Sequence, residues 1–269
     1  DRDEMERPEV RDVRFTGVKA VDRGDLADAL ATQPSACLGL VLTPFCWVTK
    51  SPLVYERRYL DRTELARDVV RLLVYYYKRG WRDAKVDTAV TRVGANQVRV
   101  TFAVTEGAPT TVASIAVDDP ARTVTRGRRG VGRLTPRPGE PLDLLRLDST
   151  VVRLREAYWN RGFGDVVVER PAIAVDDSAD TAGVRIAVRR GPLTPIASID
   201  ILHIGPQRRV SDETIRRSLT IEPGQLFRRA EVARSQRALY ESGFFRSALI
   251  DTAVATEAGS GRTVCASQA

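Results

Sequence analysis

The sequence predicts an α+β protein of three tandem βααββ units, each a three-stranded sheet packed on two helices, with the third unit incomplete. Three observations support this fold class: a short motif of aromatic residues and glycine recurs at a fixed interval, an apolar stripe of helical spacing precedes it, and alternating strands follow it. The chain has 269 residues, of which 43% are hydrophobic and 29% charged, so its size and composition fit more than one folded domain.

The recurring motif consists of an aromatic residue, two polar residues, a glycine and a second aromatic residue. Its glycines, Gly80, Gly162 and Gly243, are 82 and 81 residues apart. Because glycine readily adopts the left-handed conformation that ends a helix, each copy predicts a helix stop followed by an anchored strand. The aromatic residues of the three copies are Tyr77 and Trp81, Trp159 and Phe163, and Tyr240 and Phe244.

An amphipathic helix is predicted before each glycine. The first two copies share leucines fifteen and eight residues before it, which lie on one helix face. These leucines are Leu65, Leu72, Leu147 and Leu154. In the third copy the same distances give Arg228 and Ser235, so its stripe is weaker. The run of tyrosines at 75–77, together with Trp81, is expected to belong to the core, because the corresponding positions are apolar in the other copies.

A turn is predicted before each of these helices. Leucine, three residues and proline recur from Leu30, Leu134 and Leu219, and proline at such a place marks a turn. In the third unit, Ser211 or Asp212 is expected to cap the first helix by accepting from its exposed amides.

Alternating apolar and polar residues predict a β-hairpin after the glycine. Apolar and polar residues alternate over 84–90 and 98–104, on either side of a turn at 94–96. The second copy shows the same alternation over 165–175 and 184–188. The predicted order of elements in each unit is therefore strand, helix, turn, helix, strand, strand. We place the three domains at residues 8–106, 107–191 and 192–269.

Each unit departs from the common pattern in one place. The first carries an insertion at about residues 36–58, which is apolar around its cysteines and too short to span a bilayer; we expect it to fold back on its own domain rather than to contact a membrane or a partner. The second has no convincing first helix, because residues 126–133 are rich in glycine and arginine. The third lacks the final strand that ends on Glu-Gly in the first unit.

Tandem βααββ units with glycine and an aromatic residue after the second helix resemble POTRA domains, which precede the barrel of BamA-like and TamA-like outer-membrane assembly factors. The resemblance covers about residues 8–254 and implies a periplasmic location, as part of an outer-membrane protein whose barrel is absent here. In that oxidising compartment, Cys37 and Cys46 are expected to form a loop-closing disulfide, while Cys265 stands alone near the end.

The resemblance also implies a function and a site. Such domains act as a scaffold that binds unfolded outer-membrane proteins by β-strand addition and delivers them to the barrel for insertion, with periplasmic chaperones or accessory lipoproteins as further partners. The binding edge would be the first strand of each terminal hairpin. Its residues are Lys85, Asp87, Thr88, Ala89, Val90, Val166, Val168, Arg170, Leu249 and Asp251.

Other functions fit the sequence less well. The POTRA region of a two-partner secretion transporter, which recognises one secreted substrate, is the alternative within the family. The net charge of +7 permits a nucleic-acid partner, but the arginine-rich segment at 126–133 is expected to be a solvated loop, so we expect no nucleic acid. With one histidine and three cysteines we expect no enzyme, no metal and no cofactor, and His203 is interpreted as structural or exposed.

Overall fold

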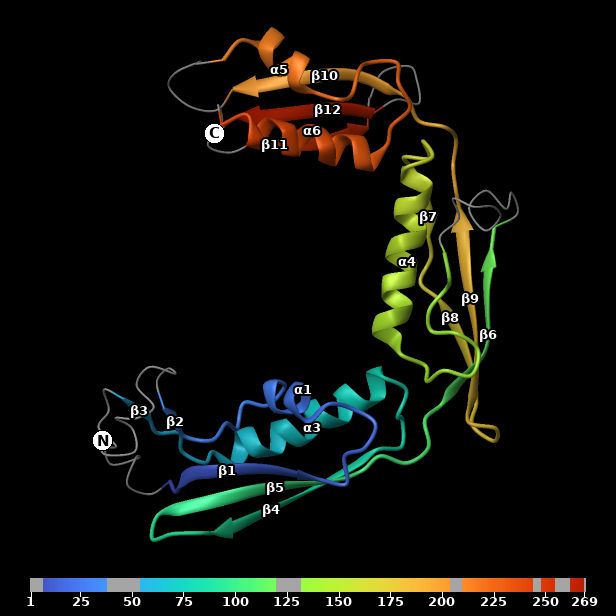
Figure 1. Ribbon diagram of the computed structural model, residues 1–269. Helices are drawn as coiled ribbons and strands as arrows, with labels where there is room; N and C mark the ends of the chain where they lie inside the picture. The colour runs from blue at the N-terminus through green and yellow to red at the C-terminus, as the bar shows by residue number, and fades with distance from the viewer. Residues whose placement is uncertain are drawn as a thin grey trace. The chain divides into compact units, whose positions relative to one another are not determined.

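The computed structural model has an α+β fold (Figure 1). It describes residues 7–37, 54–119, 132–203, 210–243, 248–254 and 262–268, with Val254 and the last of these segments described by their backbone alone. The chain divides into two compact units. One consists of Asp1–Ala113, Pro138–Leu145 and Val175–Ala182, and the other of Ser114–Arg137, Arg146–Ala174 and Gly183–Ala269. Because this division cuts through the predicted second domain, the three domain boundaries stay a prediction.

The first sheet has the strand order β1-β5-β4 (Figure 1). The strands are β1 (Glu9–Thr16), β4 (Lys85–Arg92) and β5 (Gln97–Thr105). The middle strand pairs in parallel with β1 and, as the predicted hairpin requires, antiparallel with β4. Its buried side chains, among them Val100 and Phe102, form the core with the helices of this sheet.

Two helices accompany the first sheet, α1 (Arg23–Asp28) and α3 (Arg62–Lys78). Each follows an aspartate, Asp22 or Asp61, whose carboxylate accepts hydrogen bonds from the amides of the first turn. Leu26 of α1 is fully buried, which joins this short helix to the core.

A short pair of antiparallel strands joins the two ends of the predicted insertion. Strand β2 (Ala36–Cys37) pairs antiparallel with β3 (Tyr55–Glu56). Cys37 is disulfide-bonded. Its expected partner Cys46 lies outside the described residues, so this pairing stays a prediction.

The second sheet has the order β6-β9-β7, and β8 also pairs with β9. Its elements are β6 (Thr111–Asp118), α4 (Leu144–Trp159), β7 (Val167–Val168), β8 (Ala172–Asp176) and β9 (Thr181–Arg189). The sequence predicts one outer strand over 165–175, whereas the structure splits it into β7 and β8. Pro171 stands in the gap, and proline has no amide hydrogen to give to a ladder.

The third sheet has the order β10-β12-β11. Its elements are β10 (Ile196–His203), α5 (Asp212–Ser218), α6 (Arg229–Glu241), β11 (Ala248–Val254) and β12 (Arg262–Gln268). The expectation of a missing final strand is corrected here, since β12 fills the middle position without the Glu-Gly ending. It does so by backbone pairing, in parallel with β10 and antiparallel with β11.

Helix α5 begins as the sequence predicts. Ser211 is the N-cap, and its hydroxyl accepts from the amide of Thr214 at 3.3 Å. His203 lies at the end of β10 with its Nε2 atom 2.6 Å from the carboxylate of Asp212. The histidine therefore joins the end of a strand to the start of a helix.

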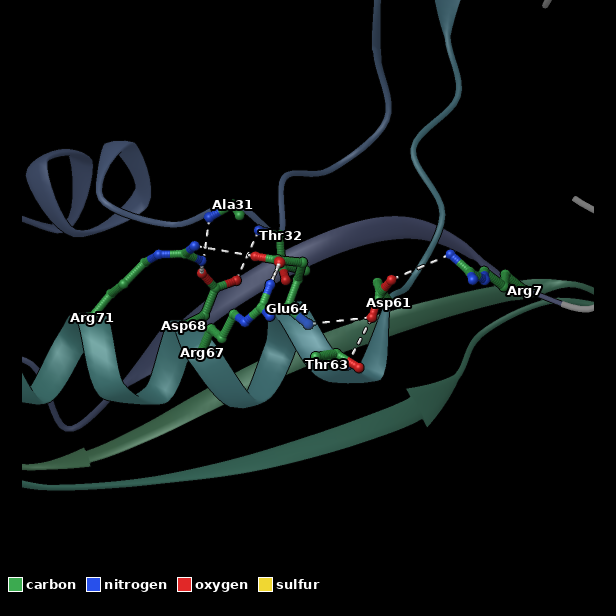
Figure 2. A network of polar contacts seen from close by, with 9 residues as sticks. All are labelled: Arg7, Ala31, Thr32, Asp61, Thr63, Glu64, Arg67, Asp68 and Arg71. Carbon is green, nitrogen blue, oxygen red and sulfur yellow. Dashed lines mark hydrogen bonds and ion pairs between the residues drawn. The ribbon is translucent and has the colours of Figure 1, made fainter. Parts of the chain in front are cut away.

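One buried polar side chain on each of α3, α4 and α6 holds the preceding turn. The carboxylate of Asp68 accepts from the amides of Ala31 at 2.9 Å and Thr32 at 2.8 Å, and pairs with Arg71 (Figure 2). In α4, Thr150 accepts from the amide of Thr135 at 3.1 Å. In α6, Ser235 accepts from the amide of Thr220 at 2.8 Å. The donors Ala31, Thr135 and Thr220 each follow the leucine of the predicted turn pattern.

These hydrogen bonds correct the predicted alignment of the third helix. Ser235 corresponds to Thr150, so Val232 and Leu239 take the places of Leu147 and Leu154, and all are buried. The apolar stripe of α6 is therefore intact. Gly243 follows the last buried leucine of α6 by one turn, whereas Gly162 follows Leu154 by two.

The tyrosine run at the end of α3 is only partly core, which corrects the expectation for Tyr77. Tyr76 is fully buried, and its hydroxyl donates to the carboxylate of Glu106 at 3.0 Å. Tyr77 is 50% exposed. Successive residues of a helix point in directions about 100° apart, so three neighbouring tyrosines cannot share one buried face.

Candidate functional site

The outer side of β4 is an open edge of the first sheet in the part of the chain that the structure describes. The outer side of β1 is covered near its start, because Val10 donates to the carbonyl of Arg58 at 2.8 Å and Leu60 donates to that of Pro8 at 2.9 Å. Among the described residues, no strand pairs with β4 on the side away from β5. The predicted edge residues Lys85, Asp87, Thr88, Ala89 and Val90 all lie on β4.

The hairpin register identifies the open backbone groups of β4. The amide of Val93 donates to the carbonyl of Gln97 at 2.9 Å. Amides in an antiparallel pair alternate between facing the partner strand and facing away from it. Counting back from Val93 by twos, Thr91, Ala89, Asp87 and Lys85 face β5, so the residues between them, Val86, Thr88 and Val90, turn their amide and carbonyl groups outward. These are the groups to which an added strand would bind.

The two faces of β4 differ in character. Val86 lies opposite Val104, and Thr88 opposite Phe102, so both side chains share the face of the sheet that packs on the helices. Lys85 and Asp87 are exposed and, by alternation, lie on the other face. An added strand would thus meet an apolar face and a charged face.

Helix α3 carries an exposed apolar row. Val70, Val74 and Tyr77 are 58%, 44% and 50% exposed, and their spacing of four and three residues places them on one side of the helix. The opposite side carries Leu65 and Leu72, which are buried in the core, and beside them the hydroxyl of Tyr75 donates to Asp25 of α1 at 3.4 Å. We call Val70, Val74 and Tyr77 the α3 row.

The outer strand of the second sheet borders a hollow of about 480 Å³. Arg155 and Trp159 of α4 line one side of it, and residues 164–168 line the other. The indole of Trp159 donates to the carbonyl of Gly164 at 3.2 Å. Of the predicted edge residues here, Val166 and Val168 are buried, and the amide of Val166 donates to the carbonyl of Phe163 at 3.4 Å. Arg170 is exposed between β7 and β8.

The outer strand of the third sheet is β11, as predicted. Leu249 is 57% exposed, and Asp251 is exposed with its carboxylate accepting from the amide of Thr252 at 2.7 Å. Gln236 of α6 donates to the carbonyl of Ala248 at 3.2 Å, which brings a polar helix side to the start of this strand.

The glycine motif has a second role that sequence reasoning missed. Gly80, Gly162 and Gly243 have φ values of +102°, +93° and +70°, which confirms the predicted helix stops. The carbonyl of Gly80 also accepts from the amide of Thr110 at 2.8 Å, and that of Gly162 from Thr194 at 2.7 Å. Each helix stop is thereby joined to the chain just before β6 or β10. The shared threonine, three residues after Gly107 and Gly191, is the sequence signal that could have revealed it. Phe244 lies outside the described residues.

The chain belongs to the POTRA family. The family model, described as surface antigen variable number repeat, matches residues 8–107 and 195–262, which together make up more than half of the chain. The part between these matches contains the divided edge strand of the second sheet.

A solved structure shares the fold of this chain. The POTRA3-5 fragment of BamA from Haemophilus influenzae matches with a TM-score of 0.58 and 15% identity, over 97% of this chain and 96% of that chain. POTRA1-3 of the periplasmic domain of Omp85 from Anabaena matches with a TM-score of 0.34 and 16% identity, over 97% and 96%. CdiB from Escherichia coli matches with a TM-score of 0.27 and 14% identity, over 67% of this chain and 27% of that chain. None of the curated proteins compared with the chain matches it significantly.

Two kinds of feature are absent from the described parts of the chain. None of the helices there has the length and apolar character needed to cross a membrane. No three His, Cys, Asp or Glu side chains gather there into a group that could hold a metal ion.

Proposed function

We propose that this chain is the periplasmic part of an outer-membrane protein assembly factor, which binds unfolded outer-membrane protein segments by β-strand addition and passes them to a membrane barrel. The observation that carries the proposal is the open outer side of β4, where the amides of Val86, Thr88 and Val90 face away from the sheet. Membership of the POTRA family and the likeness in fold to a BamA fragment support it.

Backbone pairing explains how such a scaffold would accept many clients. An added strand is held by main-chain hydrogen bonds, which every sequence can make, while the side chains beside the edge set a preference. Single contacts of this kind are weak, and β11 offers a second open edge at the outer position of its sheet. Several edges on one chain would raise the effective concentration of a bound client.

The test removes one outward amide. Thr88→Pro deletes the amide hydrogen at the middle of the open edge, and Thr88→Ala removes the side chain but keeps that amide. We expect Thr88→Pro to weaken binding of a labelled peptide of ~10 alternating apolar and polar residues, the pattern of barrel strands, by roughly tenfold. Thr88→Ala should bind like the parent chain. Val168→Pro is a poorer test, because Val168 is buried.

Fluorescence anisotropy on the full 269-residue chain measures the binding. Equal affinity of the parent chain and Thr88→Pro would contradict strand addition at β4. Binding of only one among several unrelated alternating peptides would instead favour the two-partner secretion alternative, in which the domains recognise one secreted substrate.

A further inference from the structure

We infer that the outer face of the second sheet binds a small apolar carboxylate, that is, an aliphatic chain that ends in one carboxylate group. Helix α4 lies along one face of this sheet, and the site is on the other face (Figure 1). The inference goes beyond the proposed function and does not depend on it. Three features of the described residues carry it: a hollow, a glycine that keeps the hollow open, and an arginine beside it.

The first feature is a hollow of about 400 Å³ that crosses three strands of the second sheet. It is lined by Ser114 and Ala116 of β6, residues 172–174 of β8 and residues 183–185 of β9. Burial alternates along β9, where Val184 is buried and Arg185 is exposed, so Gly183 and Arg185 lie on the face away from the core. A hollow of this size lies within the range of roughly 300–1,000 Å³ that small-molecule sites occupy.

The outer face of the first sheet is built differently, because charged side chains fill it. The carboxylate of Asp12 accepts from Arg14 at 2.6 Å and from Arg99 at 2.9 Å, and Arg99 alternates with the buried residues of β5. Paired charges in contact with water need no further partner. The small side chains on the second sheet instead leave apolar surface uncovered around the hollow.

The second feature is Gly183 in the middle strand. Its φ lies outside the left-handed region, so the backbone conformation does not require glycine there. A Cβ atom added to it would lie 3.6 Å from the Oγ atom of Ser114, which is an ordinary contact, so the sheet has room for a side chain. Glycine inside a strand weakens the strand and marks places that a ligand or another backbone approaches closely. Gly183 therefore keeps the hollow open at the centre of the sheet.

The third feature is the positive charge beside the hollow. Arg185 is exposed, and its guanidinium takes part in no hydrogen bond or ion pair with the residues that the structure describes. Arg189, on the same face of the same strand, pairs with Glu169 at 3.2 Å. A guanidinium presents its donors in a planar fork that matches the two oxygens of a carboxylate. Arg185 is thus available to an anion from outside the chain.

Together these features define the class of ligand. The apolar walls favour an aliphatic chain, because binding removes the chain and the walls from water. The single guanidinium favours one negative charge. A neutral chain would leave Arg185 unpaired, and a short acid would leave the walls in water, so an aliphatic carboxylate satisfies both parts of the site.

The experiment compares three ligands by isothermal titration calorimetry on the full chain. Octanoate has both the aliphatic chain and the charge, octanol has the chain alone, and butyrate has the charge with a shorter chain. Octanoate should bind at least several-fold more tightly than octanol. It should also bind more than roughly tenfold more tightly than butyrate, which has four fewer methylene groups to remove from water.

Variants then locate the site. Arg185→Gln should lose roughly tenfold in affinity for octanoate and little for octanol, because it removes the charge and keeps the walls. Gly183→Leu fills the hollow and should weaken both ligands. Arg189→Gln is the matched control and should bind like the parent chain. Arg185→Lys keeps the charge and should retain most of the affinity for octanoate.

Three results would overturn the inference. They are no binding of octanoate to the parent chain, equal affinity of Gly183→Leu and the parent chain, and equal losses in Arg185→Gln and Arg189→Gln. Circular dichroism checks folding, and Ala174→Leu fills the hollow from β8 if Gly183→Leu does not fold. Thr88→Pro should bind octanoate like the parent chain, so this inference and the proposed function fail independently of each other.

Discussion

The side-chain oxygen of Asn160 accepts a hydrogen bond of 2.8 Å from the amide of Ala230, in the first turn of α6. Arg228 occupies the N-cap of α6 and makes no capping bond with its side chain, because a guanidinium has no acceptor. Nearby, Trp159 packs against the core of the third sheet. Two residues of one glycine motif thus support the helix of the next sheet.

This relationship predicts that Asn160→Ala destabilises the start of α6 by about 1 kcal/mol, the usual cost of losing an N-cap acceptor. Hydrogen exchange of the amides at 230–233 measures the loss. Lys78→Ala is the matched control, since Lys78 holds the same place in the first copy of the motif and is exposed. Unchanged exchange at Ala230 in Asn160→Ala would refute the capping role.

Replacing each of the three motif glycines by alanine should lower the free energy of unfolding by a different amount. All three positions have positive φ, which costs an alanine about 1 kcal/mol or more. At Gly80 the new Cβ would lie 2.8 Å from the backbone nitrogen of Leu142, whereas at Gly162 it would lie 3.2 Å from a side-chain methyl of Leu226. At Gly243 it would meet no atom of the described residues within 4 Å. Gly80→Ala should therefore cost most and Gly243→Ala least.

Urea denaturation followed by circular dichroism measures this order. A side-chain methyl can move and a backbone nitrogen cannot, which is why Gly162→Ala should fall between the other two. Equal losses at Gly80 and Gly243 would show that backbone conformation alone accounts for the effect, without the close approach to Leu142.

The buried carboxylate of Asp68 predicts a pH dependence. Burial by itself would raise the pKa of Asp68, but hydrogen bonds from Thr32, the Ala31 amide and Arg71 outweigh it and hold the pKa below its ordinary value. Its stabilisation is therefore fully present above about pH 4 and is lost as the pH falls through the lower pKa of the folded state. Asp68→Asn should cost about 2 kcal/mol at neutral pH.

Urea denaturation between pH 7 and pH 2 tests this prediction. The difference between the parent chain and Asp68→Asn should stay constant down to about pH 4 and shrink below it, because Asp68 then becomes neutral as well. Asp83→Asn, at an exposed position, is the control. A difference that does not change with pH would mean that the charge of Asp68 contributes nothing.

The expected disulfide has a simple chemical test. Cys37 and Cys46 fall in one tryptic peptide, residues 24–50, because no lysine or arginine stands between Gly24 and Lys50. In protein exported to an oxidising compartment, this peptide should resist alkylation until it is reduced, while Cys265 reacts without reduction. Mass spectrometry distinguishes this outcome from a cross-link between peptides, which would show that Cys37 pairs with Cys265 instead.

Local signals were enough to predict most elements. The helix stops at Gly80 and Gly162 and the hairpin from Lys85 to Thr105 depend on backbone conformation and on the alternation of neighbouring residues, which a sequence displays directly. The outer position of β4 followed from the family resemblance. The divided edge strand was missed, although Pro171 is visible in the sequence.

Contacts between distant residues could not be predicted in this way. The alignment of α6 depends on the hydrogen bond from Thr220 to Ser235, and the cap of α6 depends on Asn160, 70 residues from Ala230. The sequence by itself determined the repeat interval, the helix stops and the hairpins, because these are properties of neighbouring residues. Only the tertiary structure decided which polar side chains are buried, that Tyr77 is exposed, and that β12 completes the third sheet, because these follow from how distant segments pack.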